Sequence, residues 1–244
     1  MDPDTWLAHV ALGLMHERFW RWTEADREFV QAARTMPANV EKQSPIFDAG
    51  DWPEKIRRQR QVVRLSPNSG PQHWILGLNH AYAGNAAAAA NAFRAAINLD
   101  AGRSLWHLWL AHAEGALGND ETALTELRVA EELPGVYQST LTLANLAYAY
   151  GQIDRADDAK RLFDMFADRN PDQRHHAGNW ALAHLAVRDY ESTRESLETV
   201  VHKIGNEEPD AGHIALRLIR WNVYSDPVLD QPPFSELRTQ IRGH

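Results

Sequence analysis

The feature that most constrains the fold of this chain is an internal repeat. Residues 9–16 read HVALGLMH and residues 73–80 read HWILGLNH, so the same pattern of histidines around Leu-Gly-Leu occurs twice. A third, more divergent copy begins at His107. The first copy is followed at fixed offsets by Ala25, Phe29, Ala32 and Pro37, and the second by Ala89, Phe93 and Ala96. Small and large residues that recur in this way indicate stacked helical hairpins.

The spacing has a simple physical meaning. A Leu-Gly pair such as Leu76-Gly77 lets a neighbouring helix approach the backbone closely, because glycine has no side chain there. An alanine and a large residue four positions later lie on one face of the second helix and fill the remaining space. A proline near the end of the unit stops the second helix. The sequence therefore predicts an all-α chain.

The pattern resembles the tetratricopeptide repeat, whose consensus is W-x2-L-G-x2-Y, then A-x3-F, then P. Residues 6–39 fit it, with His9 and His16 at the places of the family's Trp and Tyr. The matching positions are Leu12, Gly13, Ala25, Phe29, Ala32 and Pro37. The resemblance implies an all-α fold: a right-handed α-solenoid of helix-turn-helix repeats with a C-terminal capping segment.

We expect residues 1–244 to form a single solenoid domain. The repeats are placed at about 6–39, 40–69, 70–103, 104–136, 137–171 and 174–207, and the cap at 210–244. The unit at 40–69 is degenerate, since Pro45 interrupts its first helix, and the unit at 137–171 fits through Leu143, Ala144, Gly151 and Ala156. A terminal repeat needs a cap. We expect a final helix near the C-terminus to provide it, with Phe234, Leu237 and Ile241 on one side. The initial Met is consistent with a complete chain or with one part of a larger protein.

Composition excludes several classes of partner and site. The net charge is −8 with a pI of about 5.8, which disfavours nucleic acid and anionic membranes, because phosphate binding needs clustered Lys and Arg. No stretch approaches the roughly 18 apolar residues of a membrane span, and acidic residues near the N-terminus argue against a signal peptide. The absence of Cys removes disulfides and thiolate ligands. A cytoplasmic protein with no nucleic-acid or membrane partner is the expectation.

The histidines are better explained by packing than by metal binding. His9 and His16, like His73 and His80, are seven residues apart, whereas zinc chelation from one helix prefers an i, i+4 spacing. Phosphate-binding loops, dinucleotide fingerprints and nucleophile elbows are absent from the sequence. The basic cluster at 55–64 is interpreted as a solvated outer face. We expect no enzyme activity, no cofactor and no metal site.

The concave groove is the predicted functional surface. By the resemblance, the first helix of each repeat lines it, and the fifth positions are Val10, Trp74, Leu108, Leu141 and Gly178. None is basic, which disfavours the carboxylate clamp of chaperone-docking members of the family. The remaining groove is apolar and aromatic, suited to a helix or an extended peptide. The predicted partner-binding residues are Leu14, Arg18, Trp74, Leu78, Tyr82, Leu108, His112, Asn145 and Tyr148.

The predicted function is therefore protein–protein interaction, as a scaffold or as a regulatory domain that binds a protein or peptide partner. The alternative is a small-ligand sensor domain of a larger signalling or transcription-regulatory protein. A metal-dependent hydrolase is less favoured. Trp74, Leu78 and Tyr82 form one stripe at i, i+4 and i+8, which is either a binding hot spot or a surface covered by the chain itself. The oligomeric state and the identity of the partner are left open.

Overall fold

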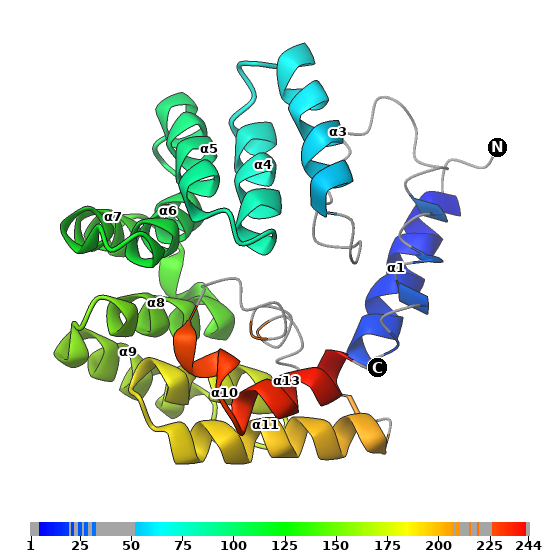
Figure 1. The fold of residues 1–244 in the computed structure, drawn as a ribbon, viewed down its shortest axis with the longest axis vertical. Coiled ribbons are helices and arrows are strands. Elements are labelled where there is room, and N and C mark those ends of the chain that lie inside the picture. The colour runs from blue at the N-terminus through cyan, green and yellow to red at the C-terminus, as the bar shows by residue number, and fades with distance from the viewer. Residues whose placement is uncertain are drawn as a thin grey trace.

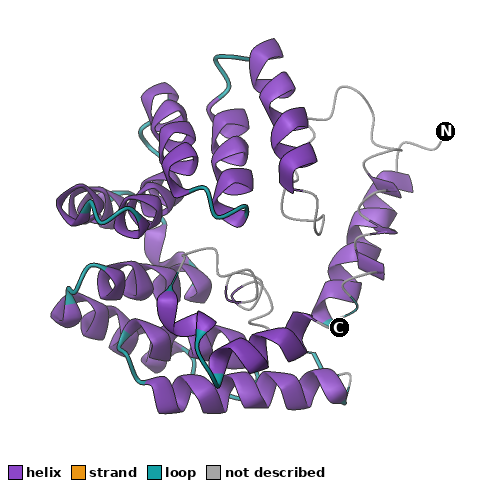
Figure 2. Ribbon diagram, viewed as in Figure 1, coloured by secondary structure: helices purple, strands orange, loops and turns teal. Residues whose placement is uncertain are grey.

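The computed structural model describes residues 5–19, 52–206 and 226–242, together with positions 21, 24, 25, 27, 28, 31, 32, 208, 209, 215 and 219. The predicted first helix of the degenerate unit, around Pro45, lies outside the described residues. All regular elements in the described part of the chain are helices (Figure 2). None of the helices in that part is long and apolar enough to cross a membrane.

The helices follow one another in a curved array (Figure 1). The elements are α1 (Thr5–Arg18), α3 (Trp52–Leu65), α4 (Gly70–Tyr82), α5 (Ala86–Leu99), α6 (Ser104–Ala116), α7 (Asp120–Glu132), η1 (Val136–Gln138), α8 (Thr140–Gln152), α9 (Ala156–Arg169), α10 (Ala177–Ala186), α11 (Tyr190–Gly205), η2 (Pro227–Asp230) and α13 (Phe234–Arg242). Figure 1 shows α4, α6, α8 and α10 on the inner side of the curve, and α5, α7, α9 and α11 on the outer side. The predicted all-α solenoid is confirmed.

The inner helices end in the same backbone motif, which fixes the register of the repeats. An amide five residues further along donates to the carbonyl of His80, Glu114, Tyr150 or His184, at 2.9–3.0 Å. This six-to-one hydrogen bond is typical of a helix that closes through a left-handed residue. Equivalent positions in successive repeats can therefore be assigned from the hydrogen bonds alone.

The left-handed residues are Gly84, Gly118, Asp154 and Arg188, with φ between 57° and 74°. In the repeat of α8 and α9 the left-handed residue is Asp154, three positions after Gly151. Asp tolerates this conformation better than most residues. Gly151 itself meets a different requirement, a close approach to α10.

Two glycines lie where no side chain fits. A Cβ on Gly77 would lie 2.4 Å from Cε1 of Phe93, so the close crossing of α4 and α5 expected at this position is present. A Cβ on Gly151 would lie 2.2 Å from the carbonyl oxygen of Ala186, at the end of α10. The first contact is within a hairpin and the second is between adjacent repeats. Glycine therefore sets the spacing between helices both within a hairpin and between adjacent repeats.

The apolar core continues from α4 through the hairpins to the C-terminal helix. Phe93, Leu127 and Phe166 are fully buried in successive outer helices. Phe234, Leu237 and Ile241 of α13 are 5%, 8% and 0% exposed, and α13 packs on α11, the last outer helix. The final helix covers the open end of the array, as a capping segment does.

Candidate functional site

The structure places most of the predicted groove residues inside the protein rather than on its surface. Trp74 is half-buried, and the side chains of Leu14 and Arg18 lie outside the described residues. The other six are only 1–7% exposed, namely Leu78, Tyr82, Leu108, His112, Asn145 and Tyr148. Burial of this degree means that a partner could reach these six side chains only after a rearrangement. Their role in binding stays a prediction.

Tyr82 is covered by the chain itself. Its ring stacks on Trp52 of α3, with the ring centroids 4.9 Å apart and the planes inclined by 16°. Burial raises the pKa of the Tyr82 hydroxyl well above its ordinary value, so the side chain is neutral. Within the predicted stripe, Leu78 is also buried and Trp74 retains partial exposure.

A polar row follows the inner side of α6 and α8. The Nδ1 atom of His112 lies 2.9 Å from Oε1 of Gln152, and the His112 ring packs at 6.0 Å from the ring of Tyr148. Burial lowers the pKa of His112 to about 4, so the imidazole is neutral at physiological pH. Because a carbonyl oxygen only accepts, Nδ1 must carry the proton and donate it to Gln152.

The same row of side chains contacts a segment near the C-terminal end of the chain. The Tyr148 hydroxyl donates to the Asp226 carboxylate at 2.6 Å, across 78 residues of sequence. Asp226 also accepts the backbone amide of Val228 at 3.0 Å and thereby caps η2. The start of η2, from near the C-terminal end of the chain, is therefore already bound to the inner side of α8.

A cavity of about 340 Å³ lies between this segment and the inner helices. Gly115, Ala116 and Gly151 leave the space open, because they carry at most a methyl group there. The lining residues are Gly115, Ala116, Tyr148, Gly151, Gln152, Leu185, Arg188, Tyr190, Asp226 and Pro227. The cavity thus combines a small-residue floor with hydroxyl, amide, guanidinium and carboxylate groups.

Sequence reasoning identified Tyr148 and His112 but missed the groups that surround them. Gln152, Arg188 and Asp226 were not predicted as site residues. A signal existed for Gln152, which follows Gly151 on the inner face at the end of α8. Asp226 had no local signal, because its partner lies 78 residues earlier.

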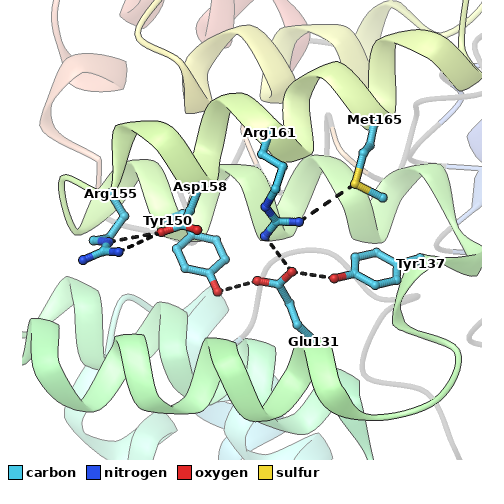
Figure 3. Close-up of polar contacts among 7 residues, drawn as sticks. All are labelled: Glu131, Tyr137, Tyr150, Arg155, Asp158, Arg161 and Met165. Carbon is cyan, nitrogen blue, oxygen red and sulfur yellow. Dashed lines mark hydrogen bonds and ion pairs between the residues drawn. The ribbon is translucent and has the colours of Figure 1, made fainter.

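A second polar cluster joins consecutive repeats through Glu131 (Figure 3). The Glu131 carboxylate accepts the hydroxyls of Tyr137 and Tyr150 at 2.5 Å each, and the guanidinium of Arg161 at 2.7 Å. Burial disfavours the charged carboxylate, but these three hydrogen bonds outweigh it and the pKa of Glu131 is lowered. The cluster ties α7, η1, α8 and α9 together, and an ionised, hydrogen-bonded carboxylate is unsuited to general acid catalysis.

The recurring histidines occupy equivalent hydrogen-bonding places. Nε2 of His73 lies 2.9 Å from the Pro67 carbonyl oxygen, and Nε2 of His107 lies 3.0 Å from that of Ala101. Nδ1 of His107 also contacts Glu126 at 2.6 Å, and this carboxylate raises the pKa of His107. Among the residues that the structure describes, no three His, Asp or Glu side chains are grouped to hold a metal ion.

No protein-family model matches the sequence, and no curated protein matches it. Among solved structures, a crystal structure of MamA is similar at 21% identity and a TM-score of 0.46, over 63% of this chain and 91% of that one. The TPR domain of P58(IPK) is similar at 14% identity and a TM-score of 0.35, over 91% of this chain and 81% of that one.

The Cut9–Hcn1 hetero-tetramer of the APC/C is similar at 16% identity and a TM-score of 0.52. The match covers 97% of this chain and 46% of the matched chain, so this protein spans about half the length of that relative. At such identities a likeness shows the fold alone. Together with the repeated backbone motif of the inner helices, it shows that this chain has an all-α helical-repeat fold like that of tetratricopeptide-repeat solenoids.

Proposed function

We propose that this chain is a protein–protein interaction scaffold or regulatory domain, whose inner face binds a peptide or a helix of a partner protein. The observation that supports the proposal best is the contact between Tyr148 and Asp226. It is a contact between the inner face and a segment of polypeptide, which is the kind of ligand proposed. The interaction would need no cofactor and no catalytic group.

The net charge of the chain restricts the class of partner, and the exposure of its groove residues restricts where that partner would bind. The net charge of −8 argues against nucleic acid and anionic membranes as partners, and it is compatible with a protein in the cytoplasm. Among the predicted groove residues with described side chains, Trp74 is the one that is still partly exposed. Large aromatic side chains commonly contribute much of the binding energy at such surfaces. We therefore assign Trp74 as the first anchor that a partner would contact.

The proposal is tested by affinity capture from a native extract, followed by binding measurements with the captured protein. Trp74→Ala should reduce binding by about 2 kcal/mol, as truncation of an aromatic anchor does. Leu99→Ala is the matched control, because Leu99 is 43% exposed but belongs to the outer helix α5. The assignment of the inner face fails if Leu99→Ala weakens binding and Trp74→Ala does not.

A small-ligand sensor is the second candidate, and the cavity beside Asp226 supports it. Its volume of about 340 Å³ lies at the lower end of the range for small-molecule sites, about 300–1,000 Å³. A thermal-shift screen of small metabolites tests this function. A ligand that binds there should raise the melting temperature of the unmodified protein and have no effect on Ala116→Leu, whose larger side chain would fill part of the cavity.

A further inference from the structure

We propose that Asp226 and Pro227, at the start of η2, are a built-in competitor of the inner face, and that the partner displaces them with a turn of the same chemistry, an aspartate followed by proline. This inference rests on the proposed function, because it assumes that the inner face binds polypeptide. It adds the chemistry of the partner and a mechanism that limits binding in the resting protein.

The hydrogen bond between Tyr148 and Asp226 defines what the inner face recognises. A phenolic hydroxyl that donates to a carboxylate at 2.6 Å forms a charge-assisted bond, which is stronger than a neutral one. Asp226 precedes Pro227, and both residues line the cavity beside Tyr148. Arg188 lines the same cavity, and its guanidinium pairs with Asp154. The hydroxyl of Tyr148 and the shape of the cavity beside Pro227 together select an acidic residue that begins a turn.

The turn that carries Asp226 is held together by its own contacts. The Asp226 carboxylate caps η2 through the Val228 amide, and Arg238 donates to the carbonyl oxygen of Leu229 at 2.7 Å and to Asp230 at 2.5 Å. The segment therefore does not depend on the inner face for its local conformation. A preformed turn of this kind loses little conformational entropy when it binds.

The contact of η2 with the inner face differs from the contact of the final helix with its neighbour. Three apolar side chains of α13 are at most 8% exposed, and α13 packs on α11, so this part is a stable cap. By contrast, Asp226 and Pro227 border an open cavity, and Pro227 is exposed. Leu229, further along η2, is 0% exposed and belongs to the apolar core. Segments with few buried apolar contacts open at lower free energy than the core. Displacement of Asp226 and Pro227 can thus leave Leu229 and the cap on α11 in place.

A tethered segment competes strongly with a free ligand. Because it belongs to the same chain, its contact with the inner face is intramolecular and is governed by an effective concentration rather than by the concentration in solution. A partner with the same contacts would therefore bind weakly until the tethered segment is released. Loss of the carboxylate in the chain should remove this competition without changing the surface that the partner contacts.

The test uses the full chain and a fluorescein-labelled synthetic peptide of residues 225–234, SDPVLDQPPF, in an anisotropy titration. Asp226→Ala should bind the peptide about tenfold more tightly than the unmodified chain, since a hydrogen bond to a charged group contributes that much or more. Tyr148→Phe should show no such gain, although it also loosens the tethered segment, because the hydroxyl that holds the peptide is missing. A peptide with Asn in place of the aspartate that corresponds to Asp226 is the ligand control and should bind more weakly to Asp226→Ala.

Equal affinity of the peptide for the unmodified chain and for Asp226→Ala would overturn the proposal, whether that affinity is high or undetectable. A gain in Tyr148→Phe equal to that in Asp226→Ala would also overturn it, because it would show general loosening. If Asp226→Ala does not fold, as judged by circular dichroism, Asp226→Asn replaces it, with a smaller gain in the same direction expected. Failure here leaves the capture experiment with Trp74→Ala unaffected, so the two proposals can fail separately.

Discussion

A single methyl group at residue 151 should destabilise the junction between two repeats. In the structure, a Cβ on Gly151 would lie 2.2 Å from the carbonyl oxygen of Ala186 and 3.1 Å from its carbonyl carbon. The obstacle is backbone rather than the end of a flexible side chain. Relief therefore requires α8 and α10 to separate, which would disturb their shared packing along the inner face.

The magnitude follows from two opposing effects. Overpacking a tight contact costs about 1–3 kcal/mol, and a backbone clash belongs in the upper part of that range. Replacing glycine by alanine inside a helix returns about 1 kcal/mol through helix propensity. We expect Gly151→Ala to lower the free energy of unfolding by about 1–2 kcal/mol. For a chain of this size, that is a fall in melting temperature of about 2–8 °C.

Gly115 provides the matched control, since it precedes its left-handed turn residue by the same three positions in the previous repeat. A Cβ there would lie 3.3 Å from a side-chain methyl carbon of Ile153, with no backbone atom in the way. Gly115→Ala should therefore leave the melting temperature unchanged or raise it, as followed by circular dichroism at 222 nm. Similar melting temperatures for the two variants, or a stabilised Gly151→Ala, would refute the reasoning.

Three further predictions concern stability. The pKa of His112 is about 4 in the folded protein and about 6.5 in the unfolded chain, so the free energy of unfolding should fall by up to about 3 kcal/mol as the pH drops from 6.5 toward 4. Urea titrations at several pH values should show a weaker pH dependence of this free energy in His112→Gln. An unchanged pH dependence would contradict a neutral, buried His112. Arg188→Gly should raise the melting temperature by a few degrees, because Arg188 has a φ of 57° and relief of such strain contributes about 1 kcal/mol. A lower melting temperature would show that the exposed ion pair between Arg188 and Asp154 stabilises the fold by more than this strain costs. Gly77→Leu should lower the free energy of unfolding by about 1–3 kcal/mol through the clash with Phe93, and an unchanged melting temperature would contradict the close crossing of α4 and α5.

The fold was predictable from the sequence because the side chains that define the repeat pack against residues close to them in the chain. Gly77 meets Phe93 only sixteen positions later in the same hairpin, so the spacing between them carries the information. The role of Gly151 near the end of α8 could not be read from the sequence, because glycine has two possible reasons to occur there. Gly151 permits the approach of Ala186, whereas the left-handed turn is made by Asp154. A sequence pattern shows that a glycine is present without showing which requirement it meets.

The candidate site was harder to predict than the fold, for a reason that the contacts make clear. Periodicity places Tyr82 and Tyr148 on the inner face, but it does not show what covers them. Trp52 from the preceding unit stacks on Tyr82, and Asp226 accepts the hydrogen bond of Tyr148 from 78 residues away. Both covering groups come from units that depart most from the repeat pattern, where offsets carry no information. Irregular segments therefore cover these two side chains of the inner face, and under the proposed function the affinity for a partner should depend on Asp226 as strongly as on the groove residues themselves.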